Sequence, residues 1–280
     1  MTIVHRSGLL LLMLAPLLGA APVAHAQSRL EAQYTASLAG IPIGKGNWII
    51  EVNEGKYSAA ASGTTTGLVR FFVGGHATGV ATGTLSNGHP VASNYAVTIA
   101  TKRHTDEVRF AVAAGTIKDI KLEPKQKPDP HRIPVTEEQQ RGVMDPMTAS
   151  LVLMPGAGDM QVPQACDRHL AIFDGKMRYN LTFAFKRMEA VKADKGYSGP
   201  AVVCSVVFEP VAGYDPHRSA IVYLTKPHGM EVWLAPIAGT RVMVPFRAQI
   251  ETPVGLGVIE ATQFVSVPAP AHVTKGLKTQ

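Results

Sequence analysis

Short runs of alternating apolar and polar residues, separated by turn residues, fill most of the chain after its first 26 residues. Period-two alternation of this kind, rich in β-branched residues, is typical of strands that bury one face. We expect strands at residues 33–39, 47–52, 57–62, 68–73, 76–85, 91–101, 107–113, 117–122, 169–173, 178–187, 202–209, 221–225, 231–236, 242–251 and 257–267. The regular spacing of the turns favours a mainly β protein: a large curved antiparallel sheet, a sandwich or an open barrel.

One segment, residues 145–154, has the pattern of a short helix. Asp145 is a good N-cap, Pro146 stands at the first helical position, and the dipeptide Pro155-Gly156 ends the pattern. The apolar residues in between lie at spacings compatible with one stripe. A helix of two to three turns is marginal alone, so we expect it to pack against the sheet.

The segment 123–142 differs from the rest of the chain because it combines four prolines with mixed charges and few apolar residues. This composition indicates an exposed linker or a flap. The C-terminal residues 268–280 have the composition of a disordered tail. We therefore expect residues 27–267 to form a single β-rich domain, with the linker or flap inserted in it.

The first 26 residues read as a secretory signal peptide. A short basic start with Arg6 precedes an apolar run, and the triplet Ala24-His25-Ala26 has the small-residue pattern of a cleavage site. The apolar run is shorter than the ~20 residues that a spanning helix needs, and it contains Pro16. We expect cleavage between Ala26 and Gln27, export to the periplasm of a Gram-negative cell, and no transmembrane helix afterwards.

Export changes how the charge and the cysteines are interpreted. Removing the leader leaves 26 basic and 21 acidic residues, a net charge of +5, which favours encounters with anionic envelope components or merely maintains solubility. Nothing in the chain resembles a nucleic-acid-binding module, so we expect no nucleic-acid partner. Cys166 and Cys204 are the only cysteines, and an even count in an oxidising compartment favours a disulfide between them.

The chain contains no motif that names a reaction. The histidines show neither H-x-H nor H-E-x-x-H spacing, and no serine lies in a G-x-S-x-G elbow. No phosphate-binding loop or dinucleotide fingerprint is present. We therefore expect no catalytic residue, no metal site and no cofactor, and we interpret the protein as a non-enzyme.

Several short motifs resemble the proteobacterial family of domains of unknown function numbered 3108. They are Tyr34 with residues 40–44, the stretch 144–151, the stretches 166–167 and 173–179, and Cys204 with residues 210–214. The resemblance covers roughly residues 33–267. It implies a periplasmic, β-rich protein with a paired cysteine, and it transfers no catalytic residue.

Three functions compete. The first is an envelope protein that binds or carries a lipid-like or other hydrophobic ligand, because small residues at 76–85 leave room inside a sheet beside bulky candidate ligand-facing residues Leu68, Phe71, Phe72 and Val73. The second is a scaffolding factor for envelope integrity that acts through an envelope protein partner. The third is a hydrolase on cell-wall or lipid substrates, which no motif supports.

Overall fold

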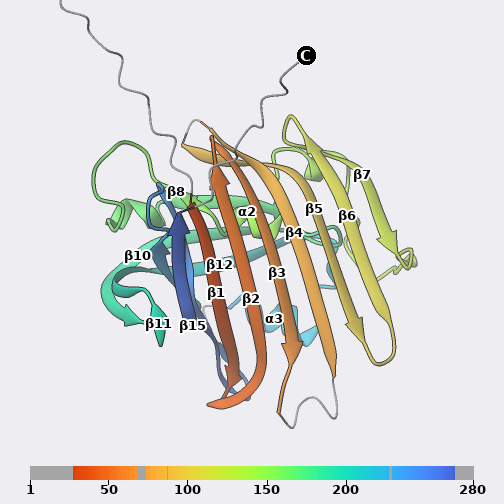
Figure 1. Cartoon of the computed structure of the whole chain (residues 1–280). Coiled ribbons are helices and arrows are strands. Elements are labelled where there is room, and N and C mark those ends of the chain that lie inside the picture. The colour runs from red at the N-terminus through yellow and green to blue at the C-terminus, as the bar shows by residue number, and fades with distance from the viewer. Residues whose placement is uncertain (1–27, 68–73, 87, 227–228, 269–280) are drawn as a thin grey trace, which may run out of the picture.

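The computed structural model describes residues 28–67, 74–86, 88–226 and 229–268, and one large sheet dominates them (Figure 1). Its strands follow the order β7-β6-β5-β4-β3-β2-β1-β15-β14-β13-β12-β10-β9, with β11 against β15 and β8 against β14. The strands are β1 (Ser28–Leu38), β2 (Ile41–Asn53), β3 (Lys56–Thr65), β4 (Gly75–Ser86), β5 (His89–Thr101), β6 (Thr105–Ala113), β7 (Thr116–Glu123), β8 (Val152–Leu153), β9 (Arg168–Phe173), β10 (Arg178–Lys192), β11 (Lys195–Gly196), β12 (Ser198–Ala212), β13 (Glu231–Pro236), β14 (Val242–Thr252) and β15 (Gly255–Pro268). The expected mainly β fold with a large antiparallel sheet is confirmed.

Alternating burial shows why these segments form strands. In β3, Tyr57 and Ala59 are buried while the alternate residues Ser58 and Ala60 are exposed, so one face of the strand packs against the core. Hairpins join most neighbouring strands. Between β9 and β10, the Asp174 carboxylate accepts hydrogen bonds from the amides of Lys176 and Met177 and so fixes the turn.

The first and last strands of the sheet lie side by side. β1 pairs with β15 from Ser28 opposite Pro268 to Leu38 opposite Gly257, with one irregularity after Gln33. On its other side β1 pairs with β2. The N-terminal strands β1–β7 and the C-terminal strands β9–β15 therefore form one continuous sheet.

The two edge strands of the sheet, β7 and β9, flank a short segment of chain. The Gly142 amide donates to the Gly115 carbonyl beside β7 over 2.7 Å, and the Met144 amide donates to Ala171 of β9 over 3.0 Å. The rings of Phe110 in β6 and Phe173 in β9 lie 5.8 Å apart. The sheet is thus curved until its edges approach one another, but within the described residues no strand pairing joins β7 to β9, so the barrel stays open.

The helix expected at residues 145–154 begins as predicted and ends early. Asp145 caps α2 (Pro146–Ala149) by accepting the amide hydrogens of Met147 and Thr148, each over 2.9 Å. After Ser150 the chain is extended, and β8 pairs with β14. A short apolar run suits a buried strand as well as a helix, and hydrogen bonds to β14 decide for the strand.

The strand expected at residues 221–225 is wrong, because this segment forms α3 (Ser219–Leu224). Its β-branched residues suggest a strand, but the segment has no strand partner in the described part of the sheet. The helix satisfies its amides locally instead: Val222 donates to Arg218 and Thr225 donates to Ile221. The other helical turns are η1 (Glu138–Gln140) and η2 (Pro163–Cys166).

Two apolar clusters account for most of the core. The larger one joins inward residues of β1–β7 to residues of β9, β10 and β12–β15, and its largest fully buried side chains include Trp233, Phe173, Phe246, Phe264, Leu30 and Ile50. The second packs β12, β13 and β14 beneath the segment that contains β8 and η2. These clusters hold the strands that form the wall of the cavity described next.

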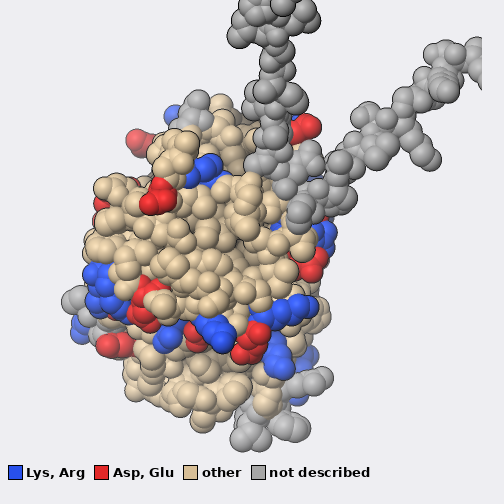
Figure 2. All heavy atoms as spheres, turned by 60° about the vertical axis from the view of Figure 1, so that its left-hand side comes forward, with Lys and Arg blue, Asp and Glu red and all other residues tan. Residues whose placement is uncertain are grey.

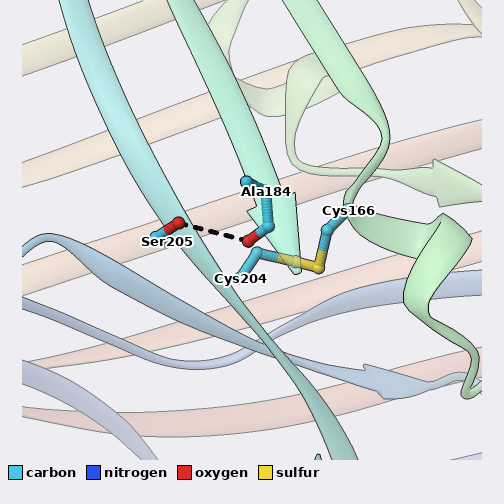
Figure 3. Close-up of a disulfide and its surroundings, with 4 residues drawn as sticks. All are labelled: Cys166, Ala184, Cys204 and Ser205. Carbon is cyan, nitrogen blue, oxygen red and sulfur yellow. Dashed lines mark hydrogen bonds between the residues drawn. A yellow bond between two sulfur atoms is a disulfide. The ribbon is translucent and has the colours of Figure 1, made fainter. Parts of the chain in front are cut away.

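The second cluster contains a disulfide (Figure 3). Cys166 and Cys204, the pair that the sequence suggests is joined, form this bond, with their Cα atoms 5.5 Å apart and neither residue exposed. Beside it, the Ser205 hydroxyl donates to the Ala184 carbonyl over 3.2 Å. The bond therefore fastens η2 to β12, the third strand from the β9 edge of the sheet.

Among the described residues, no helix combines the length and the apolar character needed to cross a membrane.

Candidate ligand-binding site

A cavity of about 680 Å³, which we call the cup, lies within the curve of the sheet. Residues of β1–β5 form one wall, and residues of β14 and β15 form the other. Ser150, which follows α2, also lines it. The cup falls in the ~300–1,000 Å³ range of small-molecule sites.

The cup exists because neighbouring strands carry small residues, in place of bulky ones, on one face of the sheet. Gly46 of β2 pairs with Gly63 of β3, Gly63 pairs with Ala77 of β4, and Ala77 pairs with Ile99 of β5. These four residues form one row across the sheet, and all of them line the cup. A Cβ added at Gly63 would meet only the Lys45 carbonyl oxygen, at 3.7 Å. The row therefore leaves free volume that the chain does not fill.

Apolar side chains line this volume and remain accessible. Ile99 is 46% exposed and Ile259 is 51% exposed, although both lie on the wall of the cup. Across β1 and β2, Ala36 pairs with both Ile259 and Gly44, which extends the apolar lining. Large aliphatic side chains exposed within a concavity indicate a surface that an apolar molecule can cover.

Residues with polar side chains also line the cup, but their polar atoms contribute little to its exposed wall. The Tyr34 hydroxyl donates to the Pro245 carbonyl over 2.7 Å, which ties β1 to β14 across the cup. The buried indole nitrogen of Trp48 has no hydrogen-bond acceptor among the described residues. Arg247 holds its guanidinium 4.7 Å from the ring centre of Trp233. The cup thus offers mainly apolar contacts.

A smaller cavity of about 270 Å³, which we call the side pocket, adjoins the cup, and the two share Ser150, Pro245 and Ala248. Its remaining walls come from α2, β8, β9, β10, β12 and β13. Two charged residues line it, Arg168 and Glu231. The other lining residues are uncharged, so these two charges dominate the electrostatics of the side pocket.

The two charges differ in how they are compensated. Burial alone would raise the pKa of the Glu231 carboxyl, but hydrogen bonds from Lys186 and Arg187 outweigh burial and lower it. Burial lowers the pKa of the Arg168 guanidinium to about 10. At neutral pH both groups are therefore charged.

A buried hydrogen-bonded group fixes α2 against the sheet. The Thr148 hydroxyl donates to the Asp145 carboxylate over 2.5 Å, and the hydroxyls of Thr148 and Tyr57 lie 2.5 Å apart. Burial raises the pKa of the Asp145 carboxyl, while its hydrogen bonds from Thr148 and Met147 act in the opposite direction. Since Tyr57 belongs to β3, this group anchors α2 to the strand that contributes Gly63.

The candidate residues of the sequence lie partly beyond the described chain. Leu68, Phe71, Phe72 and Val73 fall outside the described residues, as do the expected cleavage residues Ala26 and Gln27. The strands before and after residues 68–73, β3 and β4, do line the cup. Of the small residues expected to leave room at 76–85, Ala77 lies on the wall.

Sequence reasoning missed the other residues of the site. Gly46 and Gly63 are visible as glycines within strand patterns, a signal for close approach of another group, but their alignment depends on strand register. Ile259 and Arg168 carry no local signature, because the walls they join come from strands distant in sequence. Cys166 and Cys204 do not line either cavity.

Charges on the outer surface do not form a patch of one sign on the face shown in Figure 2, where basic and acidic side chains are interspersed. Surface ion pairs of the protein include Arg187 with Glu189 over 2.7 Å and Arg29 with Glu51 over 2.7 Å. Within the described residues, no three His, Cys, Asp or Glu side chains gather closely enough to hold a metal ion.

Comparison with known proteins places this fold. A similar solved structure is the crystal structure of a β-barrel-like protein of domain of unknown function DUF1849 from Brucella abortus, with a TM-score of 0.51. The two are 9% identical over 86% of this chain and 98% of that chain, so the likeness concerns the fold. No curated protein matches the chain. The family model of proteins of unknown function DUF3108 matches residues 33–262, which confirms the resemblance drawn from the sequence motifs, and the chain belongs to this family.

Proposed function

We propose that this protein binds a lipid-like hydrophobic ligand in the cup and acts as a binding or carrier protein rather than an enzyme. The observation that carries the proposal is the row of small residues from Gly46 to Ala77, which opens a cavity beside the accessible side chains of Ile99 and Ile259. The leader and the disulfide support a site of action in the cell envelope, which we include in the proposal.

The chemistry of the wall favours an aliphatic chain over a polar ligand. An apolar chain that covers Ile99 and Ile259 removes apolar surface from water on both partners, at ~0.8 kcal/mol per buried methylene. That increment corresponds to an affinity gain of at most about fourfold per methylene. The affinity for a series of monoacylglycerols should therefore rise with chain length until the chain fills the cup.

The decisive experiment fills part of the cup with a larger side chain introduced by mutation. In Gly63→Ile, the added side chain occupies the free volume next to Ala77, and no backbone atom obstructs its Cβ. We expect this variant to bind 1-dodecanoylglycerol at least about tenfold more weakly than the wild type, measured by isothermal titration calorimetry, because the chain loses several methylene contacts.

The matched control is Ala60→Ile, which places the same side chain on the exposed face of the same strand. This variant should bind like the wild type, since residue 60 does not line the cup. Absence of binding to the wild type, or equal binding by both variants, would contradict the proposal. Export has its own test: N-terminal sequencing of protein recovered from the envelope should read from Gln27.

A further inference from the structure

Arg168 is a cation in an apolar pocket. It opens β9 and pairs across the ladder with Phe183 of β10, and its guanidinium lies 5.9 Å from the centre of that ring. One of its nitrogens donates to the Leu151 carbonyl over 3.1 Å. Among the described residues Arg168 forms no ion pair, so this hydrogen bond and the ring contact are its polar interactions.

The acid in the same pocket does not compensate Arg168. Glu231 is almost fully buried, and its two carboxylate oxygens are engaged by Lys186 and by Arg187, the latter over 3.1 Å. Lys186 and Arg187 already compensate this carboxylate, and Arg187 also pairs with Glu189, so the positive charge of Arg168 has no anionic partner in the side pocket. A partly buried guanidinium is stabilised when an anion with matching geometry reaches it.

The side pocket adjoins the cup. The two cavities share the lining residues Ser150, Pro245 and Ala248, so both border the segment that follows α2. The cup supplies apolar contacts, and the side pocket supplies a planar donor with several N–H groups. This combination of an apolar cavity and one adjoining cation is suited to an amphiphile with a single anionic end.

We propose that Arg168 binds the anionic head group, a carboxylate or a phosphate, of a ligand whose chain lies in the cup. The inference rests on the proposed function, because it assigns the head group of the same ligand. The guanidinium can donate two parallel hydrogen bonds to either head group. Arg247, the guanidinium on the wall of the cup, has an unpartnered buried Nε, but it stacks on Trp233, donates to Gln249 over 3.0 Å and lies 3.8 Å from the Glu260 carboxylate. Unlike Arg168, it is therefore already paired with an anion.

The test compares two ligands that differ only in head group. The wild-type protein and Arg168→Gln are titrated by calorimetry with dodecanoate, which is anionic, and with 1-dodecanoylglycerol, which is neutral. We expect the substitution to weaken dodecanoate roughly 10- to 100-fold, the usual effect of losing a charge-assisted hydrogen bond, and to leave the neutral ester nearly unchanged. Retained binding of the neutral ester also shows that the variant is folded.

Three further variants sharpen the result. Arg168→Lys keeps the charge and loses the fork of donors, so it should bind dodecanoate with an affinity between those of the wild type and Arg168→Gln. Lys45→Gln tests a competing site, because Lys45 also lines the cup, whereas Lys56→Gln removes an exposed lysine that lines neither cavity and should have no effect. If Lys45→Gln weakens dodecanoate and Arg168→Gln does not, the head group lies at Lys45 and the inference is wrong.

Failure of this inference is distinguishable from failure of the proposed function. If the wild type binds neither dodecanoate nor its neutral ester, the cup does not hold a chain. If both bind and Arg168→Gln changes them equally, the cup holds a chain and Arg168 does not select its head group. Repeating the titration of the wild type with dodecyl phosphate identifies the preferred anion. The two ligands carry chains of similar length, so a difference in affinity reflects the head group.

Discussion

Removing the cross-link between Cys166 and Cys204 should lower the free energy of unfolding by an amount set mainly by the length of the closed loop. The two cysteines are 38 residues apart in sequence. In the chain-entropy relation, a loop of this length reduces the entropy of the unfolded chain by about 13 cal/mol/K, or about 4 kcal/mol at 25 °C. Since both sulfurs are buried within an apolar cluster, the folded protein should retain their packing after reduction.

The assay is urea unfolding followed by the fluorescence of Trp48 and Trp233, for the oxidised protein and for protein reduced while unfolded and then refolded in reductant. At an m-value of about 3 kcal/mol/M, a loss of 4 kcal/mol lowers the midpoint by about 1.3 M urea. Cys166→Ala/Cys204→Ala is the control, because reductant should not change its midpoint. A difference below about 1 kcal/mol between oxidised and reduced protein would refute the reasoning, because the loop would then not constrain the unfolded chain.

Two other features give predictions of known sign. Burial raises the pKa of the Asp145 carboxyl, so its contribution to stability is fully present below the unfolded pKa of about 3.9 and is lost as the pH rises through the folded pKa. The difference in free energy of unfolding between the wild type and Asp145→Asn, measured by urea titrations from about pH 4 upward, should therefore become less favourable to the wild type as the pH rises. The slope should be at most about 1.4 kcal/mol per pH unit, and a change in the opposite direction would contradict the reasoning. Gly213 and Gly239 have nearly equal φ angles, +80° and +76°, but an added Cβ lies 2.0 Å from the Lys176 carbonyl oxygen at the first and near nothing at the second. Alanine at either position should lower the free energy of unfolding by about 1–2 kcal/mol because of the left-handed backbone. Gly213→Ala should lower it by about 1–3 kcal/mol more because of the clash. Equal midpoints of thermal unfolding for the two variants would show that the backbone near Lys176 shifts to accept the added Cβ.

Local patterns predicted the strands well because burial on one face repeats every second residue. The expected run 57–62 lies within β3, and the Asp174-Gly175 turn joins β9 to β10 as its composition indicates. Periodicity does not predict the structure of a segment where pairing with a distant strand, or the lack of such a partner, determines it. The apolar residues after Ser150 extend along β14 instead of continuing α2, and residues 221–225 form α3 because no strand lies beside them.

The candidate site was predicted only in part. Small residues in β4 suggested free volume, but the row from Gly46 to Ile99 depends on the register of four strands, which a period-two pattern does not specify. Arg168 could not be chosen from the sequence for a similar reason. Its environment is created by α2, β10, β12 and β13, and the missing counter-ion becomes evident only when Glu231 is seen to be paired elsewhere.

The pairing of β1 with β15 also determines the order in which the molecule can assemble. These two strands are the first and last of the described chain, and their ladder joins residues more than two hundred positions apart. Hairpins of β2–β7 can form early from neighbouring residues, but β1 presents an unpaired edge until the final strand arrives. The wall of the cup is completed by Ile259 of β15, so a chain that lacks its last strand has an incomplete cup. Completion of the cup should therefore be the last event of folding.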